Sequence, residues 1–178
     1  MKPRPFDYAR PETVDEAVDL LAEYGEAVAH ELSSIDPDGA DVYAANAAAF
    51  SAQMSGLEAD YASGLAQCEL DTIVVTHLAY GYMTSNLGIT QVGLSDFDPQ
   101  TEPSAARLLE IKKLIQDTGV TTIFSESAVT TSVADSIARD SGATVAVLET
   151  GGAVVVGDDY IGLMNRNLDA LRKALVCD

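Results

Sequence analysis

Three side chains that can bind a cation each come directly after an apolar run typical of a β-strand. His77 follows the first of four such runs, Glu126 the third and Glu149 the fourth. The carboxyl ends of parallel strands meet at one edge of a sheet, so we expect the three side chains to lie near one another. An imidazole with one or two carboxylates is a suitable ligand set for zinc or manganese.

These residues also have structural interpretations. A histidine at a strand end is often a helix cap or a hydrogen-bonded group. Glu126 precedes a predicted helix, whose dipole favours a carboxylate. Enzymatic chemistry has little support. The chain has no GxSxG motif, its glycine-rich loop at 151–157 does not match a phosphate-binding GxGxxG, and its other histidine, His30, is expected on a helix surface.

Strands and helices are predicted to alternate after residue 68. Strands that are apolar throughout and separated by helices indicate a parallel sheet covered on both faces. The expected strands are 72–76, 88–94, 120–124 and 144–148, and the expected helices are 78–86, 103–118, 129–140 and 159–176. The fold class is therefore α/β, a four-stranded parallel sheet with helices on both faces. An acidic loop at 95–99 is expected at the carboxyl edge.

The preceding region is predicted to be helical. Thr13 and Glu16 fit a capping box that begins a helix ending at Gly25, and a second helix at 28–35 ends at a turn over 36–39. A long amphipathic helix follows at about 41–67. Its expected buried face carries Phe50, Met54, Leu57, Tyr61 and Leu65. This helix is longer than a small α/β domain needs, which indicates a neighbouring domain.

The composition narrows the possible partners. The 178 residues include 28 acidic and 10 basic ones, a net charge of −18, and 47% are hydrophobic. Such a surface repels nucleic acid and anionic membranes; it could concentrate cations or simply keep the protein soluble. No segment approaches the length of a membrane span, and the first residues lack the apolar region of a secretion signal. As written, the chain is expected in the cytoplasm.

The two cysteines leave two alternatives open. Cys68 follows the long helix and Cys177 ends the last helix. An oxidising compartment would join them if those helix ends meet, closing a loop of about 110 residues. Otherwise they are free thiols. Neither lies in a CxxC pair, so a cysteine-based zinc site is not expected.

Several motifs in order over about residues 28–177 resemble one family. They are Asp36-Pro37 with Tyr43 and Asn46, Thr76-His77-Leu78-Ala79-Tyr80-Gly81-Tyr82, Glu102-Pro103-Ser104, Ile123-Phe124-Ser125-Glu126, and Tyr160 with Met164, Asn167 and Leu168. This region is similar to the C-terminal lobe of the zinc/manganese solute-binding proteins of ABC transporters.

The resemblance implies a two-lobed, non-enzymatic protein that carries a divalent metal in its cleft and passes it to a membrane permease. His77 matches this lobe's histidine ligand, and Glu149 matches the position where the family usually has an aspartate. Glu126 matches a glutamate that orients the ligands without binding the metal. The family's other two histidines belong to an N-terminal lobe that this chain lacks. The resemblance also implies a location outside the cytoplasm, in the periplasm or at the cell surface.

The first 25 residues resemble a different family. Lys2-Pro3-Arg4-Pro5-Phe6-Asp7-Tyr8-Ala9-Arg10-Pro11 is similar to the opening of the FAD-binding medium subunit of molybdenum hydroxylases. The expected domains are therefore an appended helical segment at 1–27 and a carrier lobe at 28–178, the latter divided into the long helix and an α/β lobe at 68–178.

Three functions follow from these observations. The leading one is weak binding of zinc, or manganese, by a truncated carrier lobe whose His77 and Glu149 form half a site. The second is a folded, vestigial or chimeric domain that binds nothing. The third is a fragment related to a flavin-binding hydroxylase subunit. The resemblance to that subunit stops before any flavin-binding loop.

Overall fold

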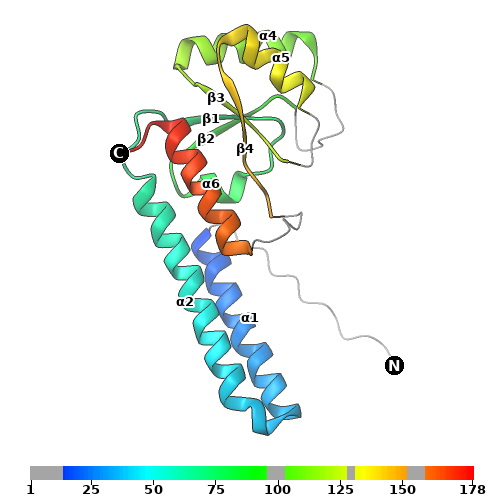
Figure 1. The fold of residues 1–178 in the computed structure, drawn as a ribbon, viewed down its shortest axis with the longest axis vertical. Coiled ribbons are helices and arrows are strands. Elements are labelled where there is room, and N and C mark those ends of the chain that lie inside the picture. The colour runs from blue at the N-terminus through cyan, green and yellow to red at the C-terminus, as the bar shows by residue number, and fades with distance from the viewer. Residues whose placement is uncertain (1–13, 96–102, 128–130, 152–158) are drawn as a thin grey trace, which may run out of the picture. The chain divides into compact units, whose positions relative to one another are not determined.

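The computed structural model describes residues 14–95, 103–127, 131–151 and 159–178. They form two compact units, one up to Ser55 and one from Gly56 onward, and each is considered by itself. The first unit contains α1 (Val14–Ile35), the 3-10 turn η1 (Pro37–Gly39) and the first part of α2 (Ala40–Gly64), blue to cyan in Figure 1. The boundary expected after residue 27 falls within α1 and stays a prediction.

α1 is one continuous helix, so the predicted stop at Gly25 is wrong. A Cβ atom added at Gly25 would lie 3.7 Å from Cδ1 of Phe50 in α2, so the glycine faces the packing surface between the two helices. A glycine inside a helix costs about 1 kcal/mol relative to alanine. Helix packing outweighs that cost here. The expected turn at 36–39 is present as η1, and the expected cap Thr13 lies outside the described residues.

α2 confirms the long helix, although it ends at Gly64. Met54, Leu57, Tyr61 and Leu65 are buried as predicted. Phe50 is 37% exposed, so the prediction of a buried side chain is wrong there. The described part of the first unit has only two α-helices. A side chain between them, such as that of Phe50, is therefore covered on one side only and remains partly exposed to solvent.

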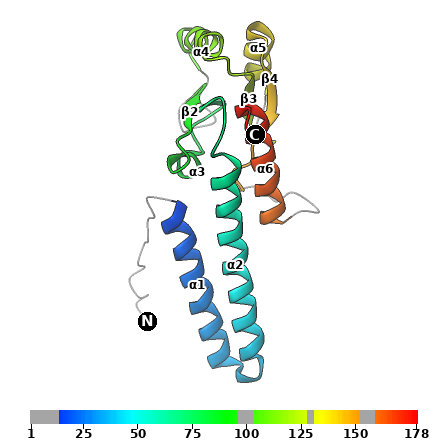
Figure 2. The ribbon, with the colours of Figure 1, turned by 90° about the vertical axis from the view of Figure 1, so that its left-hand side faces the viewer.

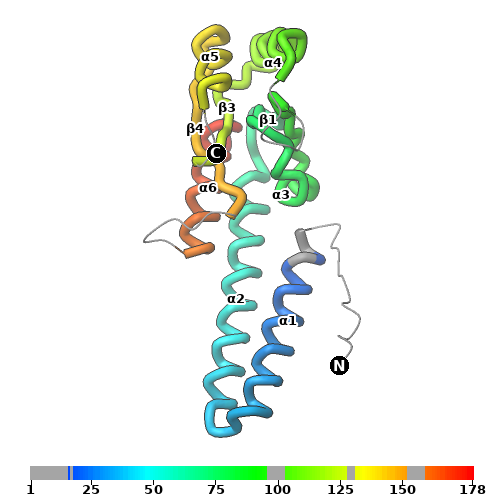
Figure 3. The backbone as a smooth tube through the Cα atoms, turned by 90° about the vertical axis from the view of Figure 1, so that its right-hand side faces the viewer, coloured from blue at the N-terminus to red at the C-terminus, as the bar shows by residue number. Residues whose placement is uncertain are grey.

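The second unit contains the predicted four-stranded parallel sheet. Its strands are β1 (Thr72–Val75), β2 (Thr90–Gly93), β3 (Thr122–Ser125) and β4 (Thr144–Val147), in the order β2-β1-β3-β4. Figure 3 shows β3 between β1 and β4. All three pairings are parallel. β4 is an edge strand, which explains why its last residue, Val147, is 52% exposed although the run is apolar.

Helices cover both faces of this sheet, as predicted. They are α3 (Gly81–Ser85), α4 (Ala105–Thr118), α5 (Ser132–Ser141) and α6 (Tyr160–Leu175). α4 and α5 lie on one side of the strands, and α3 and α6 on the other (Figure 2). Alternate strand residues divide between the two cores: Ile73 and Val75 face α6, and Val74 faces α4 and α5. α3 is shorter than the helix predicted at 78–86. Among the described residues, no helix is both long and apolar enough to cross a membrane.

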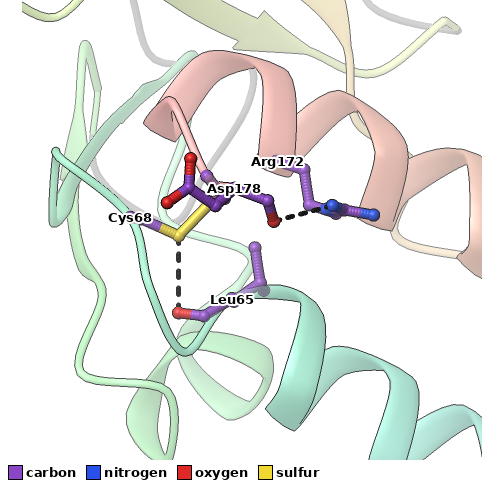
Figure 4. The surroundings of a disulfide bond; sticks show 5 residues. Leu65, Cys68, Arg172 and Asp178 are labelled. Carbon is purple, nitrogen blue, oxygen red and sulfur yellow. Dashed lines mark hydrogen bonds between the residues drawn. A yellow bond between two sulfur atoms is a disulfide. The ribbon is translucent and has the colours of Figure 1, made fainter.

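Cys68 and Cys177 form a disulfide bond in the structure. The chain around both residues is already paired through its backbone: the amides of Glu69 and Leu70 donate to the carbonyls of Val176 and Leu175, at 3.1 and 3.0 Å. Figure 4 shows the bond beside the Arg172 guanidinium, which donates to the carbonyl oxygen of Asp178 at 2.8 Å. The disulfide therefore joins the end of α6 to the segment that follows α2.

Candidate metal centre at the carboxyl edge of the sheet

The topology places the candidate site between β1 and β3. From β1 the chain passes to β2 on one side, then returns to β3 on the other side of β1. Adjacent strands whose connections leave in opposite directions form a switch point, and α/β domains bind ligands outside the carboxyl ends of such strands. His77 follows β1 and Glu126 follows β3. The site therefore forms where this sheet is expected to bind a ligand.

His77 and Glu126 are in direct contact. Nε2 of His77 lies 3.0 Å from Oε1 of Glu126, and their side chains are only 8% and 16% exposed. Nδ1 of His77 lies 3.4 Å from the hydroxyl of Thr76. The structure contradicts two of the structural interpretations: α3 has Tyr80 as its N-cap, not His77, and α5 begins at Ser132, too far along the chain for Glu126 to lie in its first turn. The remaining interpretation of His77, a hydrogen-bonded group, agrees with its contact with Glu126.

Glu149 joins the same network from the loop after β4. Its Oε1 accepts a hydrogen bond from the backbone amide of Ser127 at 3.3 Å. In return, the hydroxyl of Thr150 donates to Oε2 of Glu126 at 3.0 Å. Glu149 is 9% exposed. The loops after β3 and β4 thus exchange hydrogen bonds through the two glutamates.

The backbone that carries Glu149 is fixed by two buried side chains for which no role was predicted from the sequence. Asn167 in α6 hydrogen-bonds both the amide and the carbonyl of Glu149, at 2.9 and 2.7 Å. The hydroxyl of Tyr80 donates to the carbonyl of Leu148 at 2.6 Å. Burial raises the pKa of Tyr80 well above its usual value of 10.0, and the charges of Glu126 and Glu149 raise it further, so the hydroxyl remains a donor. The sequence offered one indication of this role: Asn167 lies within the apolar face of the last helix, and a buried amide needs hydrogen-bond partners.

The site is suited to binding a cation but is incomplete as a ligand cage. A buried imidazole and two carboxylates suit a divalent ion. Within the described residues, however, no group of three or more histidine, cysteine, aspartate or glutamate side chains could hold a metal ion. His30 lies elsewhere, and its side chain is 82% exposed, as expected for a surface residue.

A parallel α/β lobe with polar side chains at its switch point has the construction of a ligand-binding domain. Comparison with known proteins gives the family. The sequence model described as "ZnuA: Zinc-uptake complex component A periplasmic" matches residues 17–174. The chain therefore belongs to this family of zinc-binding solute-binding proteins, whose members are non-enzymatic transport components. The match includes residues 17–27, which were predicted to belong to an appended segment.

Two relatives illustrate the extent of the similarity. The zinc-binding protein AdcA of Streptococcus pyogenes is 31% identical over 152 residues, which cover 83% of this chain and 30% of AdcA. The high-affinity zinc uptake system protein ZnuA of Bacillus subtilis is 32% identical over 146 residues, which cover 79% of this chain and 46% of ZnuA. The chain thus spans less than half the length of these relatives.

Solved structures show the same fold. The laminin-binding protein Lbp of Streptococcus pyogenes matches with a TM-score of 0.74 and 32% identity, covering 91% of this chain and 61% of that one. The Zn(II)-bound ZnuA-like domain of Streptococcus pneumoniae AdcA matches with a TM-score of 0.71 and 28% identity, covering 92% and 61%. They confirm the α/β fold class predicted from the sequence.

Proposed function

We propose that this chain supplies His77 and Glu149 as ligands to a divalent cation, with zinc as the cargo of a zinc-uptake transporter. Glu126 holds the His77 ring without binding the cation. The observation that carries the proposal is the buried contact between His77 and Glu126 at the switch point. Histidines that bind metals usually donate their other ring nitrogen to a carboxylate or carbonyl, which fixes the ring and its tautomer.

Two protein ligands do not make a tight zinc site, since structural sites use four and catalytic sites at least three. We therefore expect weak zinc binding by this chain alone. Its relatives AdcA and ZnuA are longer, and further ligands would come from a region outside the 178 residues or from a second copy of the chain. In the complete system the cation would pass to an ABC permease.

We place this function outside the cytoplasm, in the periplasm or at the cell surface. The disulfide between Cys68 and Cys177 supports that location, because such bonds persist in oxidising compartments. The family description, which names a periplasmic component, supports it as well.

Zinc titration of the full chain tests the proposal, and the two histidines provide a matched pair of variants. The Cε1 proton of each ring is followed by NMR while zinc is added to the parent, His77→Ala and His30→Ala. We expect His30→Ala to bind zinc as weakly as the parent, His77→Ala to lose saturable binding, and Glu149→Gln, which keeps one side-chain oxygen, to bind zinc more weakly than the parent but still measurably. The same titration with manganese shows whether the site prefers zinc.

Two results would overturn the proposal. Equal affinity in His77→Ala and His30→Ala would mean that zinc binds elsewhere on the acidic surface. If the parent binds no zinc, the chain is better explained as a folded domain that carries no metal. The described residues already favour that alternative in one respect, because they contain no group of three ligands that could hold a metal ion.

A further inference from the structure

We infer that Asn167 is a positioning residue that aims the Glu149 carboxylate into the metal site. This inference rests on the proposed function. Asn167 lies in α6, opposite the loop after β4, and is 3% exposed. Nothing in its own chemistry makes it a ligand here, because its amide is already bound to the protein backbone.

The contact is a two-point clamp on a single residue. The amide oxygen of Asn167 accepts from the backbone N–H of Glu149 at 2.9 Å, and its amide nitrogen donates to the carbonyl of Glu149 at 2.7 Å. The same nitrogen lies 3.6 Å from the sulfur of Met164. The amide of an asparagine carries an acceptor and a donor side by side, so this one side chain satisfies both backbone groups of Glu149.

The position of Glu149 explains why a clamp is needed. β4 is an edge strand that ends at Val147, so one side of the chain beyond it has no neighbouring strand to pair with. Asn167 takes the part of that missing neighbour. Both backbone groups of Glu149 are thereby held, and the direction of its Cα–Cβ bond is held with them. The carboxylate then reaches the amide of Ser127 on the adjacent loop.

A positional role and a purely structural role predict different couplings. If Asn167 acts through Glu149, removing the clamp should weaken zinc binding only while the carboxylate is a ligand. Outer residues that orient metal ligands typically contribute about 10- to 100-fold to affinity. A structural role would lower the melting temperature and leave the affinity of the folded protein unchanged.

The experiment compares Asn167→Leu with Leu168→Ala in the full chain. Leu168 is the next residue of α6, is 8% exposed and packs in the apolar core. Its side chain is a hydrocarbon, so it forms no hydrogen bond with the loop that carries Glu149. Both changes should lower the melting temperature. At a temperature where all variants are folded, we expect zinc affinity to fall about tenfold or more in Asn167→Leu and to stay at the parent's value in Leu168→Ala. Asn167→Ser, which leaves room for water, serves if Asn167→Leu does not fold.

A double-mutant cycle with Glu149→Gln completes the test. Adding Asn167→Ser to Glu149→Gln should cause no further loss of affinity for zinc. Equal zinc affinity in Asn167→Ser and the parent, or losses that add fully in the cycle, would overturn this inference while His77-dependent binding kept the proposed function intact. A parent chain that binds no zinc would overturn both.

Discussion

Reducing the disulfide is expected to lower the free energy of unfolding by about 5 kcal/mol. The two cysteines are 109 residues apart in the sequence. The chain-entropy relation for a loop of that length gives about 16 cal/mol/K of lost entropy in the unfolded chain, or about 4.8 kcal/mol at 25 °C. For a chain of this size, 1 kcal/mol shifts the melting temperature by roughly 2–4 °C, so reduction should lower it by about 10–20 °C.

The native state itself should change little on reduction. The segment after α2 and the end of α6 remain paired through backbone hydrogen bonds from Glu69 and Leu70, and from Asp178 to Gln67. Because these contacts hold the two ends together without the bond, its effect is expected mainly on the unfolded chain. The far-ultraviolet circular dichroism at 25 °C should therefore be the same before and after reduction.

Thermal unfolding with and without reductant measures this effect. A Cys68→Ala/Cys177→Ala variant should melt near the temperature of the reduced parent, and reductant should not shift it further. Free thiols in the untreated parent would show that the bond does not form. A drop of only a few degrees, in protein shown to contain the bond, would refute the entropy argument and point to residual structure in the unfolded chain.

Two further perturbations test the second unit and its connection to α2. Burial raises the pKa of both Tyr80 and Tyr61 above the usual value of 10.0. The unfolded chain therefore loses these protons first, and stability should fall above about pH 10 by about 1.4 kcal/mol per pH unit for each tyrosine. Tyr80→Phe should remove one tyrosine's share of that slope in urea unfolding. Gly93→Ala would place Cβ against the carbonyl oxygen of Ser95, so we expect the free energy of unfolding to fall by about 1–3 kcal/mol or more. In the control, Gly56→Ala, the added Cβ meets open space on the exposed side of α2, and the change should stabilise the helix by up to about 1 kcal/mol. Equal effects of the two substitutions on stability would contradict the close packing at Gly93 in β2.

The sequence allowed the carboxyl edge to be located but not the pairings within it. Apolar runs ending in His77, Glu126 and Glu149 indicate three strands that share an edge, whatever their order. Which carboxylate contacts the histidine depends on strand order, and that depends on how the crossover helices pack. The structure puts β3 beside β1 and leaves β4 at the edge, so Glu126 contacts His77 and Glu149 is one loop further away.

Where the prediction failed, a tertiary contact had outweighed a local signal. Gly25 has the local signature of a helix end, yet α1 continues through it because Phe50 of α2 packs against that position. Asn167 presents the converse case. Its type indicates only that a buried amide needs partners, and the partners lie 18 residues away in the sequence, at Glu149. Neither contact can be derived from spacing.

The hydrogen bonds at the carboxyl edge also limit how tightly this chain can bind a cation. One oxygen of Glu126 contacts His77 and the other accepts from Thr150, while one oxygen of Glu149 accepts from the amide of Ser127. These contacts offset the cost of burying polar and charged groups. A cation that binds Glu149 must compete with the Ser127 amide, so its affinity is the difference between two sets of interactions. With only the two ligands proposed above, His77 and Glu149, we expect that difference to be small, and we infer that tight binding requires ligands from beyond these residues.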